Sequence, residues 1–95
     1  MPAYVVVDID VTDPARYEEY KRLAPPAIAA YGGKYLARGG QVDVLEGTWQ
    51  PGRLVILEFE NAARAKAWLE SPEYAPARAM RQASARTNMV VIGGA

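Results

Sequence analysis

The sequence predicts an α+β fold in which helices cover one face of a four-stranded antiparallel sheet. Residues 4–11 and 53–59 are rich in β-branched side chains and alternate with a period of two, as strands do. A segment with helical periodicity follows each of these two stretches. The elements therefore come in the order strand, helix, strand, strand, helix, strand, and this order is typical of a single antiparallel sheet with helices on one side.

The length of 95 residues is that of one domain, and we expect residues 1–95 to form a single unit. About half of the residues are apolar (51%), but there is no cysteine that could crosslink the chain. A domain this small buries only a modest core, and self-association is a common way to compensate. We therefore expect a homodimer.

The charge balance excludes several classes of partner. Eleven Lys and Arg residues offset eleven Asp and Glu residues, so the formal net charge is zero. The chain lacks the basic surface of a nucleic-acid-binding protein and the cationic cluster that attracts anionic lipid, so we expect neither partner. Its N-terminal apolar run is too short for a signal peptide and nothing is long enough to span a bilayer, which predicts a cytoplasmic protein.

The sequence contains neither cysteine nor histidine. This composition excludes a thiol nucleophile, a Ser-His-Asp triad, an imidazole base and a histidine-ligated metal or haem. The chemistry that remains belongs to carboxylates, tyrosines, lysines and arginines. We expect no cofactor and no metal.

The first strand is predicted over residues 4–11, and its two faces differ. The side chains that share the apolar face are those of Val5, Val7, Ile9 and Val11. That face suits packing under helices. The opposite face becomes polar at Asp8 and Asp10, so it should border water or a polar cavity.

A helix is predicted to begin at Asp13 and Pro14, since aspartate caps helices and proline fits the first helical position. Its apolar stripe consists of Tyr17, Tyr20, Ala24, Ala27, Ile28 and Tyr31. Pro25 and Pro26 lack backbone N–H groups and crowd the preceding turn. We therefore predict a break or kink over residues 23–25 and a short second helix that ends before a left-handed cap at Gly32.

The second strand is predicted over residues 34–38, with a bulge or corner at Gly39-Gly40. Residues 42–46 should continue as extended strand, and residues 47–52 should form a turn-rich loop. Residues 53–59 give the strongest strand pattern, which indicates a central position in the sheet.

The last third of the chain predicts helix and then strand. Asn61 can cap a helix whose inner face is Ala65, Trp68 and Leu69. Ser71 and Pro72 should restart the helix by the same logic, and it should run to about residue 83. A final strand is predicted over residues 86–92. The complete order is that of the ferredoxin-like fold, and two such sheets could bury their uncovered faces against each other in a dimer.

Short segments spread over nearly the whole chain form a specific combination. They are Val7-Asp8, Asp13-Pro14, Gly32-Gly33, Arg38-Gly39-Gly40, Leu45-Glu46-Gly47, Arg53-Leu54, Leu57-Glu58-Phe59, Trp68 and Ser71-Pro72-Glu73-Tyr74. This combination resembles the bacterial family catalogued as domain of unknown function 1330. The resemblance implies a protomer of the dimeric α/β-barrel group, whose members include cofactor-free monooxygenases, small-molecule isomerases and decarboxylases, and haem-handling proteins. It implies no particular reaction, because the family has none established.

Two glycine pairs, at 32–33 and 39–40, do not match a phosphate-binding loop. No G-x-x-x-x-G-K-[ST] or G-x-G-x-x-G pattern is present, and no helix follows directly. A helix cap and a strand corner explain these glycines instead.

Charged residues cluster around the hairpin formed by the second and third strands. They are Arg38, Glu46, Arg53 and Glu58. Two guanidinium groups and two carboxylates could hold a small anionic or enolic substrate, with one carboxylate as base. Alternatively, they form cross-strand ion pairs that fix the register.

The paired carboxylates of Asp8 and Asp10 are a second candidate. Their backbones are about 7 Å apart on one strand face, and such a pair can divide acid and base roles. The alternative is that both are solvated or paired with arginine. Asp8 is the better candidate because it lies deeper in the strand.

Among the aromatic residues, Trp49 and Tyr74 are candidates for ligand contact. Trp49 lies in a loop where nothing local requires an aromatic side chain, so it should cover a pocket, anchor a dimer contact or fold back onto its own sheet. Trp68 lies on a helical apolar stripe and should belong to the core.

The leading interpretation is a small-molecule-binding protein, acting as a cofactor-independent enzyme that transfers protons on a small carbonyl or enol compound. Asp8, Glu58 and Arg38 are the candidate catalytic residues. The candidate ligand-binding residues are Tyr74, Trp49, Arg53 and Glu46. The alternative interpretation is a non-catalytic homodimeric binding or scaffold domain whose charged residues only fix the interface.

Overall fold

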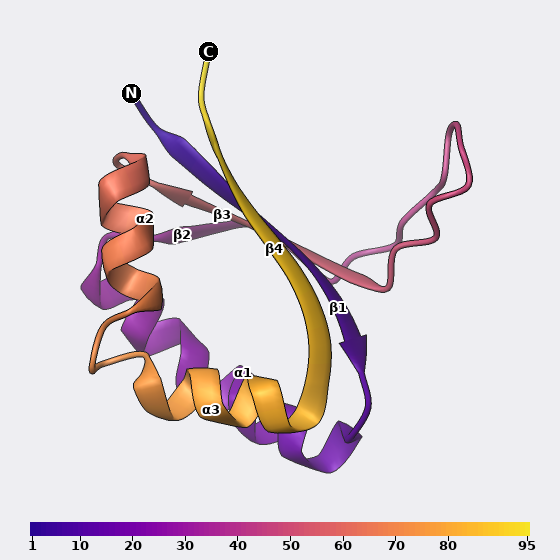
Figure 1. Cartoon of the computed structure of the whole chain (residues 1–95), viewed down its shortest axis with the longest axis horizontal. Helices are drawn as coiled ribbons and strands as arrows, with labels where there is room; N and C mark the ends of the chain where they lie inside the picture. Colours follow the sequence, from indigo (N-terminus) through magenta and orange to yellow (C-terminus); the bar gives the residue numbers. More distant parts are fainter.

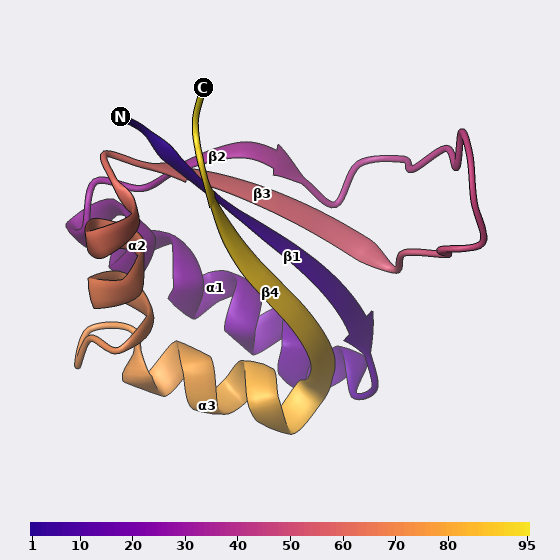
Figure 2. The same cartoon turned by 45° about the horizontal axis from the view of Figure 1, so that its top comes forward.

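A computed structural model describes all 95 residues. Its elements in chain order are β1 (Ala3–Val11), α1 (Pro14–Ala30), β2 (Lys34–Arg38), β3 (Arg53–Phe59), α2 (Ala62–Leu69), α3 (Ala75–Ser84) and β4 (Ala85–Gly93). The four strands form one antiparallel sheet in the order β2-β3-β1-β4. All three helices pack against the same face of this sheet (Figures 1 and 2). The predicted ferredoxin-like fold is confirmed.

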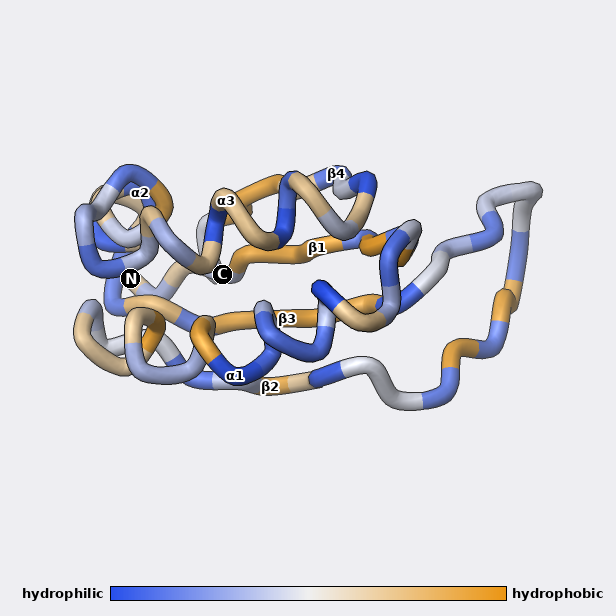
Figure 3. The backbone as a smooth tube through the Cα atoms, turned by 90° about the horizontal axis from the view of Figure 1, so that it is seen from below, coloured by the Kyte–Doolittle hydropathy of each residue, from blue (hydrophilic) through white to orange (hydrophobic).

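The two central strands separate a covered face of the sheet from an open face. In β1 the residues at odd positions from Ala3 to Ile9 are buried under the helices. In β3 the covered positions are Val55, Leu57 and Phe59. Figure 3 shows these apolar stretches of β1 and β3 running alongside each other beneath the helices. This alternation confirms the two-faced strand predicted from the sequence.

Helix α1 begins as predicted but does not break where predicted. The Asp13 side chain accepts a hydrogen bond from the Arg16 backbone N–H at 3.2 Å, and Pro14 occupies the first turn. The helix then continues through Pro25 and Pro26 to Ala30. The predicted break was wrong because the flanking turns bury Ala24, Ala27 and Ile28 against the sheet, and this packing holds the helical path despite the missing N–H groups.

The end of α1 confirms the predicted glycine cap. Gly32 has a φ of +74°, and the N–H groups of Gly32 and Gly33 donate to the carbonyls of Ala29 and Ile28, each at 2.9 Å. This pattern turns the chain into β2. Gly33 also lies so close to Ile28 and Phe59 that a β-carbon there would come within 2.7 Å of both side chains.

The connection between β2 and β3 differs from the prediction in two respects. The register shift lies between Tyr35 and Ala37, not at Gly39-Gly40, so Leu36 is the bulged residue. Residues 42–46 form no strand. Instead, residues 39–52 make an arm that projects away from the body of the protein (Figures 1 and 2). They lie beyond the sheet, where no neighbouring strand can pair with them, so extended propensity alone could not make a strand.

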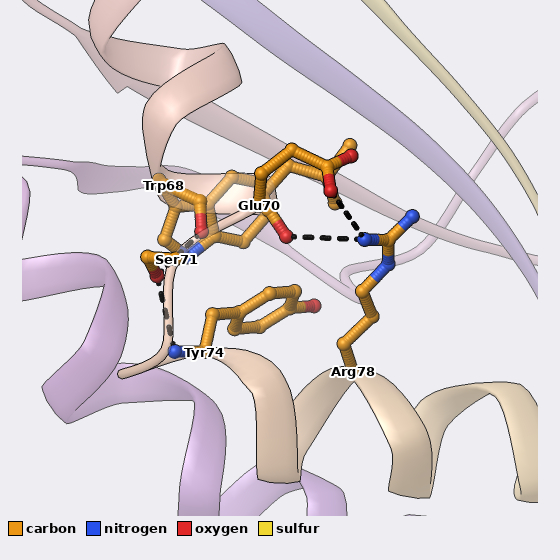
Figure 4. A network of polar contacts seen from close by, with 6 residues as sticks. Trp68, Glu70, Ser71, Tyr74 and Arg78 are labelled. Atoms are coloured by element: carbon orange, nitrogen blue, oxygen red, sulfur yellow. Dashed lines mark hydrogen bonds and ion pairs between the residues drawn. The ribbon is translucent and has the colours of Figure 1, made fainter.

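Helices α2 and α3 are joined by a tight turn in which Ser71 and Tyr74 are buried. Asn61 caps α2 through a hydrogen bond from the Arg64 backbone N–H, at 2.8 Å, as predicted. The third helix was predicted to restart at Pro72, but it begins at Ala75. The Ser71 hydroxyl donates to the Trp68 carbonyl and accepts from the Tyr74 backbone N–H (Figure 4), which tightens the chain into a turn before the helix can start.

The open face of the sheet is partly apolar and remains uncovered in the protomer. Leu36, Val90 and Ile92 are 54–60% exposed there. The exposed arm adds Val42, Val44, Leu45 and Trp49 to the uncovered apolar surface. None of the helices has the length and hydropathy that a membrane-spanning segment needs.

Candidate functional site

A small cavity lies between the covered face of the sheet and the helices. Its wall is mainly apolar and aromatic, and it includes Val7 and Ile9 of β1 and Val55 and Leu57 of β3. The polar residues on its lining are Tyr17, Tyr20, Lys21, Tyr35, Arg38 and Arg53. No carboxylate is among the lining residues. The site therefore presents positive charge and hydroxyl groups to whatever enters it.

Arg38 closes one side of the cavity by reaching from β2 to α1. Its Nη2 donates to the Lys21 carbonyl at 3.2 Å, and its guanidinium lies 4.5 Å from the centre of the Tyr35 ring. The Lys21 carbonyl is free to accept because its usual helical partner, the N–H of residue 25, is absent in Pro25. The proline that was expected to break the helix thus leaves an acceptor for Arg38.

Arg53 is more deeply placed than Arg38. Its Nε is buried and has no hydrogen-bond partner, and its guanidinium lies 5.8 Å from the centre of the Tyr17 ring. No acidic residue forms an ion pair with either arginine. A buried guanidinium donor without an acceptor is costly, and an anionic or polar ligand would satisfy it.

Gly39 makes room for the Arg53 side chain. A β-carbon at this position would lie only 1.9 Å from Arg53 Nη1, and the φ of Gly39 is +68°. Both the space and the backbone conformation require glycine. The first residue of the second glycine pair therefore helps to place the guanidinium at the cavity.

A second set of polar groups extends from Tyr20, in the wall of the cavity, into the core. The hydroxyl oxygens of Tyr20 and Tyr74 are 2.9 Å apart, and Arg81 Nε donates to the Tyr74 hydroxyl at 3.3 Å. Burial, followed by the proximity of Tyr74, raises the pKa of Tyr20 far above its ordinary value. Burial likewise raises the pKa of Tyr35. Both phenols therefore stay protonated at neutral pH.

The enclosed volume of the cavity is about 20 Å³, which is the room of a single water molecule. A larger molecule can enter only if side chains at the mouth move. Arg38 is exposed and Lys21 is half-buried, and both are long and flexible, so the mouth is formed by the most mobile kind of side chain.

The predicted site residues divide between the two faces of the sheet. Arg38 and Arg53 lie together at the cavity. Tyr74 is fully buried and does not line the cavity, but its hydroxyl contacts that of Tyr20, which does. The predicted cluster of four charges does not assemble within the protomer, and none of its members forms an ion pair.

Asp8 and Trp49 meet on the open face, where they hold the base of the arm. Trp49 Nε1 donates to Asp8 Oδ2 at 3.0 Å, and the Gly52 N–H donates to Asp8 Oδ1 at 2.9 Å. Asp8 and Asp10 also line a polar surface hollow of about 360 Å³, which includes Arg86. Asp8 cannot reach the cavity from this side of the sheet.

Glu58 and Glu46 are also remote from the cavity. Glu58 lies on the open face, opposite Lys34 in β2 and Tyr4 in β1. Glu46 is exposed in the arm. The roles predicted for Asp8, Glu58, Trp49 and Glu46 therefore require a molecule on the open face or a partner protomer.

Two features of the site were missed from the sequence. Tyr17 and Tyr20 could supply hydroxyls to a pocket between helices and sheet, but their apolar stripe favoured a core role, and their position beside the arginines was not predicted. Arg81 was not considered, although it is only 6% exposed. Its spacing of four from Ala77, which is also buried, could have shown that it points inward.

Solved structures share this fold at low sequence identity. The RPA0582 protein of unknown function from Rhodopseudomonas palustris is 19% identical, with a TM-score of 0.79 over 96% of this chain and 80% of its own. A dimeric ferredoxin-like protein of unknown function from Jannaschia sp. CCS1 is 16% identical, with a TM-score of 0.73 over 99% and 100%. A comparison with curated proteins found no match.

Another similar structure has a stated activity. SnoaB, a cofactor-independent oxygenase from Streptomyces nogalater, is 14% identical, with a TM-score of 0.69 over 99% of this chain and 93% of its own. At such identities the likeness concerns the fold alone. The family model for "Domain of unknown function (DUF1330)" matches residues 2–95, and the chain accordingly belongs to this family, as its sequence motifs predicted.

Proposed function

We propose that this protein binds a small anionic carbonyl or enol compound in the cavity between the sheet and the helices. The observation that carries the proposal is the pair formed by Arg38 and Arg53, which faces the cavity without any carboxylate to neutralise it. Arginine binds carboxylates and other planar oxyanions through parallel N–H donors. The aromatic wall would pack against the flat body of such a ligand.

The same donors favour one kind of chemistry. When a proton leaves the carbon next to a carbonyl group, negative charge develops on the oxygen, and preorganised donors stabilise that charge most. We therefore propose that any turnover is proton transfer or related chemistry through an enolate, without a cofactor. Because no carboxylate lines the cavity, the proton that leaves the carbon would pass to a water molecule there. SnoaB is described as cofactor-independent and has the same fold, which supports this proposal as an analogy only.

The carboxylates that could act as base lie outside the cavity of one protomer. Asp8 and Glu58 are on the open face, where a partner subunit would meet them. We limit the proposed catalytic role to Arg38, and we propose Arg53 and Tyr74 as residues that bind or support the ligand.

We also propose that the chain forms a homodimer through the open face of its sheet. Exposed apolar side chains on β2 and β4, and on the arm, would be removed from water in such a dimer. Similar structures from Jannaschia and from Bacteroides fragilis are described as dimeric, which agrees with this proposal.

A non-catalytic dimeric domain is the second candidate function. The observation in its favour is that Arg38 already has partners inside the protomer, namely the Lys21 carbonyl and the Tyr35 ring. In that case the arginines would stabilise the fold instead of binding a ligand.

Ligand-detected NMR with acetoacetate, pyruvate, benzoate and salicylate separates these candidates. We expect at least one of these anions to bind with a Kd below about 1 mM. Replacing either arginine, as Arg38→Met or Arg53→Met, should weaken binding about tenfold to a hundredfold, because a hydrogen bond to a charged group contributes about 1.5–3 kcal/mol.

Arg16→Met is the matched control, because Arg16 is an exposed arginine of α1 outside the cavity. It should bind like the wild type. The proposal fails if none of the anions binds, or if both cavity variants retain wild-type affinity. Reduced stability of the Arg38 and Arg53 variants without any loss of binding would favour the second candidate.

A further inference from the structure

A chain of hydrogen bonds connects the cavity to a buried cation. Tyr20 lines the cavity, and its hydroxyl contacts that of Tyr74, which has no exposed surface. Arg81 donates to the Tyr74 hydroxyl through Nε and to the Thr87 hydroxyl through Nη1. The Arg81 guanidinium is buried, and no carboxylate forms an ion pair with it.

The chemistry of arginine determines which group donates and which accepts in this series of hydrogen bonds. A guanidinium can only donate, so the Tyr74 oxygen must accept from Arg81. If Tyr20 also donated to Tyr74, the Tyr74 hydrogen would be buried without an acceptor, because Tyr20 is the other hydroxyl partner found beside it. A buried donor without an acceptor costs about 1–3 kcal/mol. Tyr74 has no exposed surface, whereas Tyr20 is half-buried and lines the cavity, so a hydrogen without a partner in the protein is less costly on Tyr20. On this argument Tyr74 donates to Tyr20.

This direction leaves the Tyr20 hydrogen without an acceptor in the protein, at the wall of the cavity. We infer that Tyr20 donates this hydrogen to an oxygen of the bound ligand, and that Tyr74 and Arg81 are positioning residues that hold Tyr20 as a donor. The inference rests on the proposed ligand site. It adds a third donor to the two arginines and identifies the ligand as one with a carbonyl or oxyanion oxygen that reaches the Tyr20 side of the cavity.

The buried cation strengthens this donor. Hydrogen bonds in series polarise one another, and the positive charge of Arg81 at one end favours negative charge at the other. The raised pKa of Tyr20 agrees with this role, because the phenol keeps its proton at neutral pH and acts as a donor, not as a base.

Proton NMR of the protein with ¹³C-labelled tyrosine tests, without any ligand, whether Tyr74 donates to Tyr20. Each hydroxyl proton correlates with the carbons of its own ring, and a buried, hydrogen-bonded proton exchanges slowly with water. We expect a slowly exchanging proton on Tyr74 and a faster one on Tyr20. The inference is overturned if the slow proton belongs to Tyr20.

Two variants separate positioning from mere stabilisation. In Arg81→Met nothing obliges Tyr74 to donate, so the slow proton should appear on Tyr20 in part or all of the molecules. Arg81→Lys keeps the positive charge and should keep the proton on Tyr74 if the ammonium reaches the hydroxyl. A purely structural Arg81 would change stability in Arg81→Met but leave the slow proton on Tyr74, and this result would also overturn the inference.

The affinity of tyrosine variants for salicylate then tests whether the Tyr20 hydroxyl contacts the ligand. We expect Tyr20→Phe and Tyr74→Phe to weaken binding about fivefold to tenfold, since a hydrogen bond contributes about 1 kcal/mol or more. Tyr31→Phe removes an exposed hydroxyl that donates to Glu73, and it should have no effect.

The outcomes distinguish the two proposals. If salicylate and the other three anions all fail to bind the wild type, the proposed function fails, and the inferred ligand contact fails with it, whatever proton direction is measured. If the wild type binds salicylate and Tyr20→Phe binds equally well, the inference fails while the proposed function stands.

Discussion

Two residues near the cavity, Pro25 and Gly39, position its arginines because each lacks a group that other residues have. Pro25 has no N–H, which leaves the Lys21 carbonyl free to accept from Arg38 at 3.2 Å. Gly39 has no β-carbon, which leaves space for the Arg53 guanidinium. Pro25 thus helps to position Arg38, and Gly39 helps to position Arg53, the two cations that we propose as ligand contacts.

Burial raises the pKa of Tyr20, and this shift predicts how the unfolding free energy depends on pH. The unfolded chain ionises near the ordinary tyrosine pKa of about 10, whereas the folded protein keeps the proton. Unfolding above pH 10 therefore releases a proton, so the stabilising contribution of Tyr20 is complete below pH 10 and falls as the pH rises further. We expect Tyr20→Phe to remove about 1.4 kcal/mol per pH unit from the slope of the unfolding free energy above pH 10.

Urea unfolding at several pH values between 9 and 11.5 measures this slope. Tyr31→Phe removes a phenol that lies outside the Tyr20–Tyr74 pair, and it serves as the control variant. Equal slopes for the wild type and Tyr20→Phe would contradict the prediction.

At the scale of elements, the arm of residues 39–52 is held at its two ends rather than along its length. The Gly39 N–H donates to the Leu54 carbonyl at 2.8 Å, and Asp8 accepts from Trp49 and Gly52 at the other end. A β-carbon on Gly52 would lie 2.4 Å from the Ile9 carbonyl oxygen. The arm therefore leaves the sheet in a defined direction.

The second glycine pair allows a matched test of this junction. Gly39→Ala should destabilise the protein by at least about 1–2 kcal/mol, because its φ is left-handed and the new methyl group displaces Arg53. Gly40→Ala meets no atom within 4 Å and should stay within about 0.5 kcal/mol of the wild type. Urea midpoints measure both variants, and equal midpoints would show that Gly39 is not required.

At the scale of the whole molecule, the sheet separates two surfaces that differ in character. The covered face carries the arginine and tyrosine cavity. The open face carries Asp8 and Glu58 together with uncovered apolar side chains such as Val90 and Ile92. A homodimer through the open face would explain why these apolar residues point into solvent in the protomer.

Sedimentation equilibrium tests this assembly. We expect the wild type at micromolar concentration to have the mass of two chains. Val90→Asp places a charge on the open face and should shift the protein to a monomer, because burying an unpaired charge is unfavourable. Ala63→Asp places the same charge on an exposed position of α2 and should leave the dimer intact. A monomeric wild type would refute the proposed interface.

The sequence by itself determined the order of the elements, most of their boundaries and the two-faced character of the sheet. These features depend on local periodicity, on the caps at Asp13 and Asn61, and on the left-handed turn at Gly32. Residues that are close in the sequence determine all of them. The same local reasoning failed at Pro25-Pro26 and at residues 42–46. There, packing against the sheet kept one helix whole, and the lack of a neighbouring strand left an extended segment unpaired.

Only the tertiary structure decided which charged residues meet. Arg38 and Arg53 were candidates from the sequence, but the side of the sheet on which each candidate lies depends on register, and the bulge at Leu36 shifts the register of β2. The link from Arg81 through Tyr74 to Tyr20 has one local and one long-range step. Arg81 and Tyr74 are 7 positions apart on α3 and its N-cap, whereas Tyr74 and Tyr20 are 54 positions apart. The second contact arises from packing α1 on α3, and no local pattern encodes it.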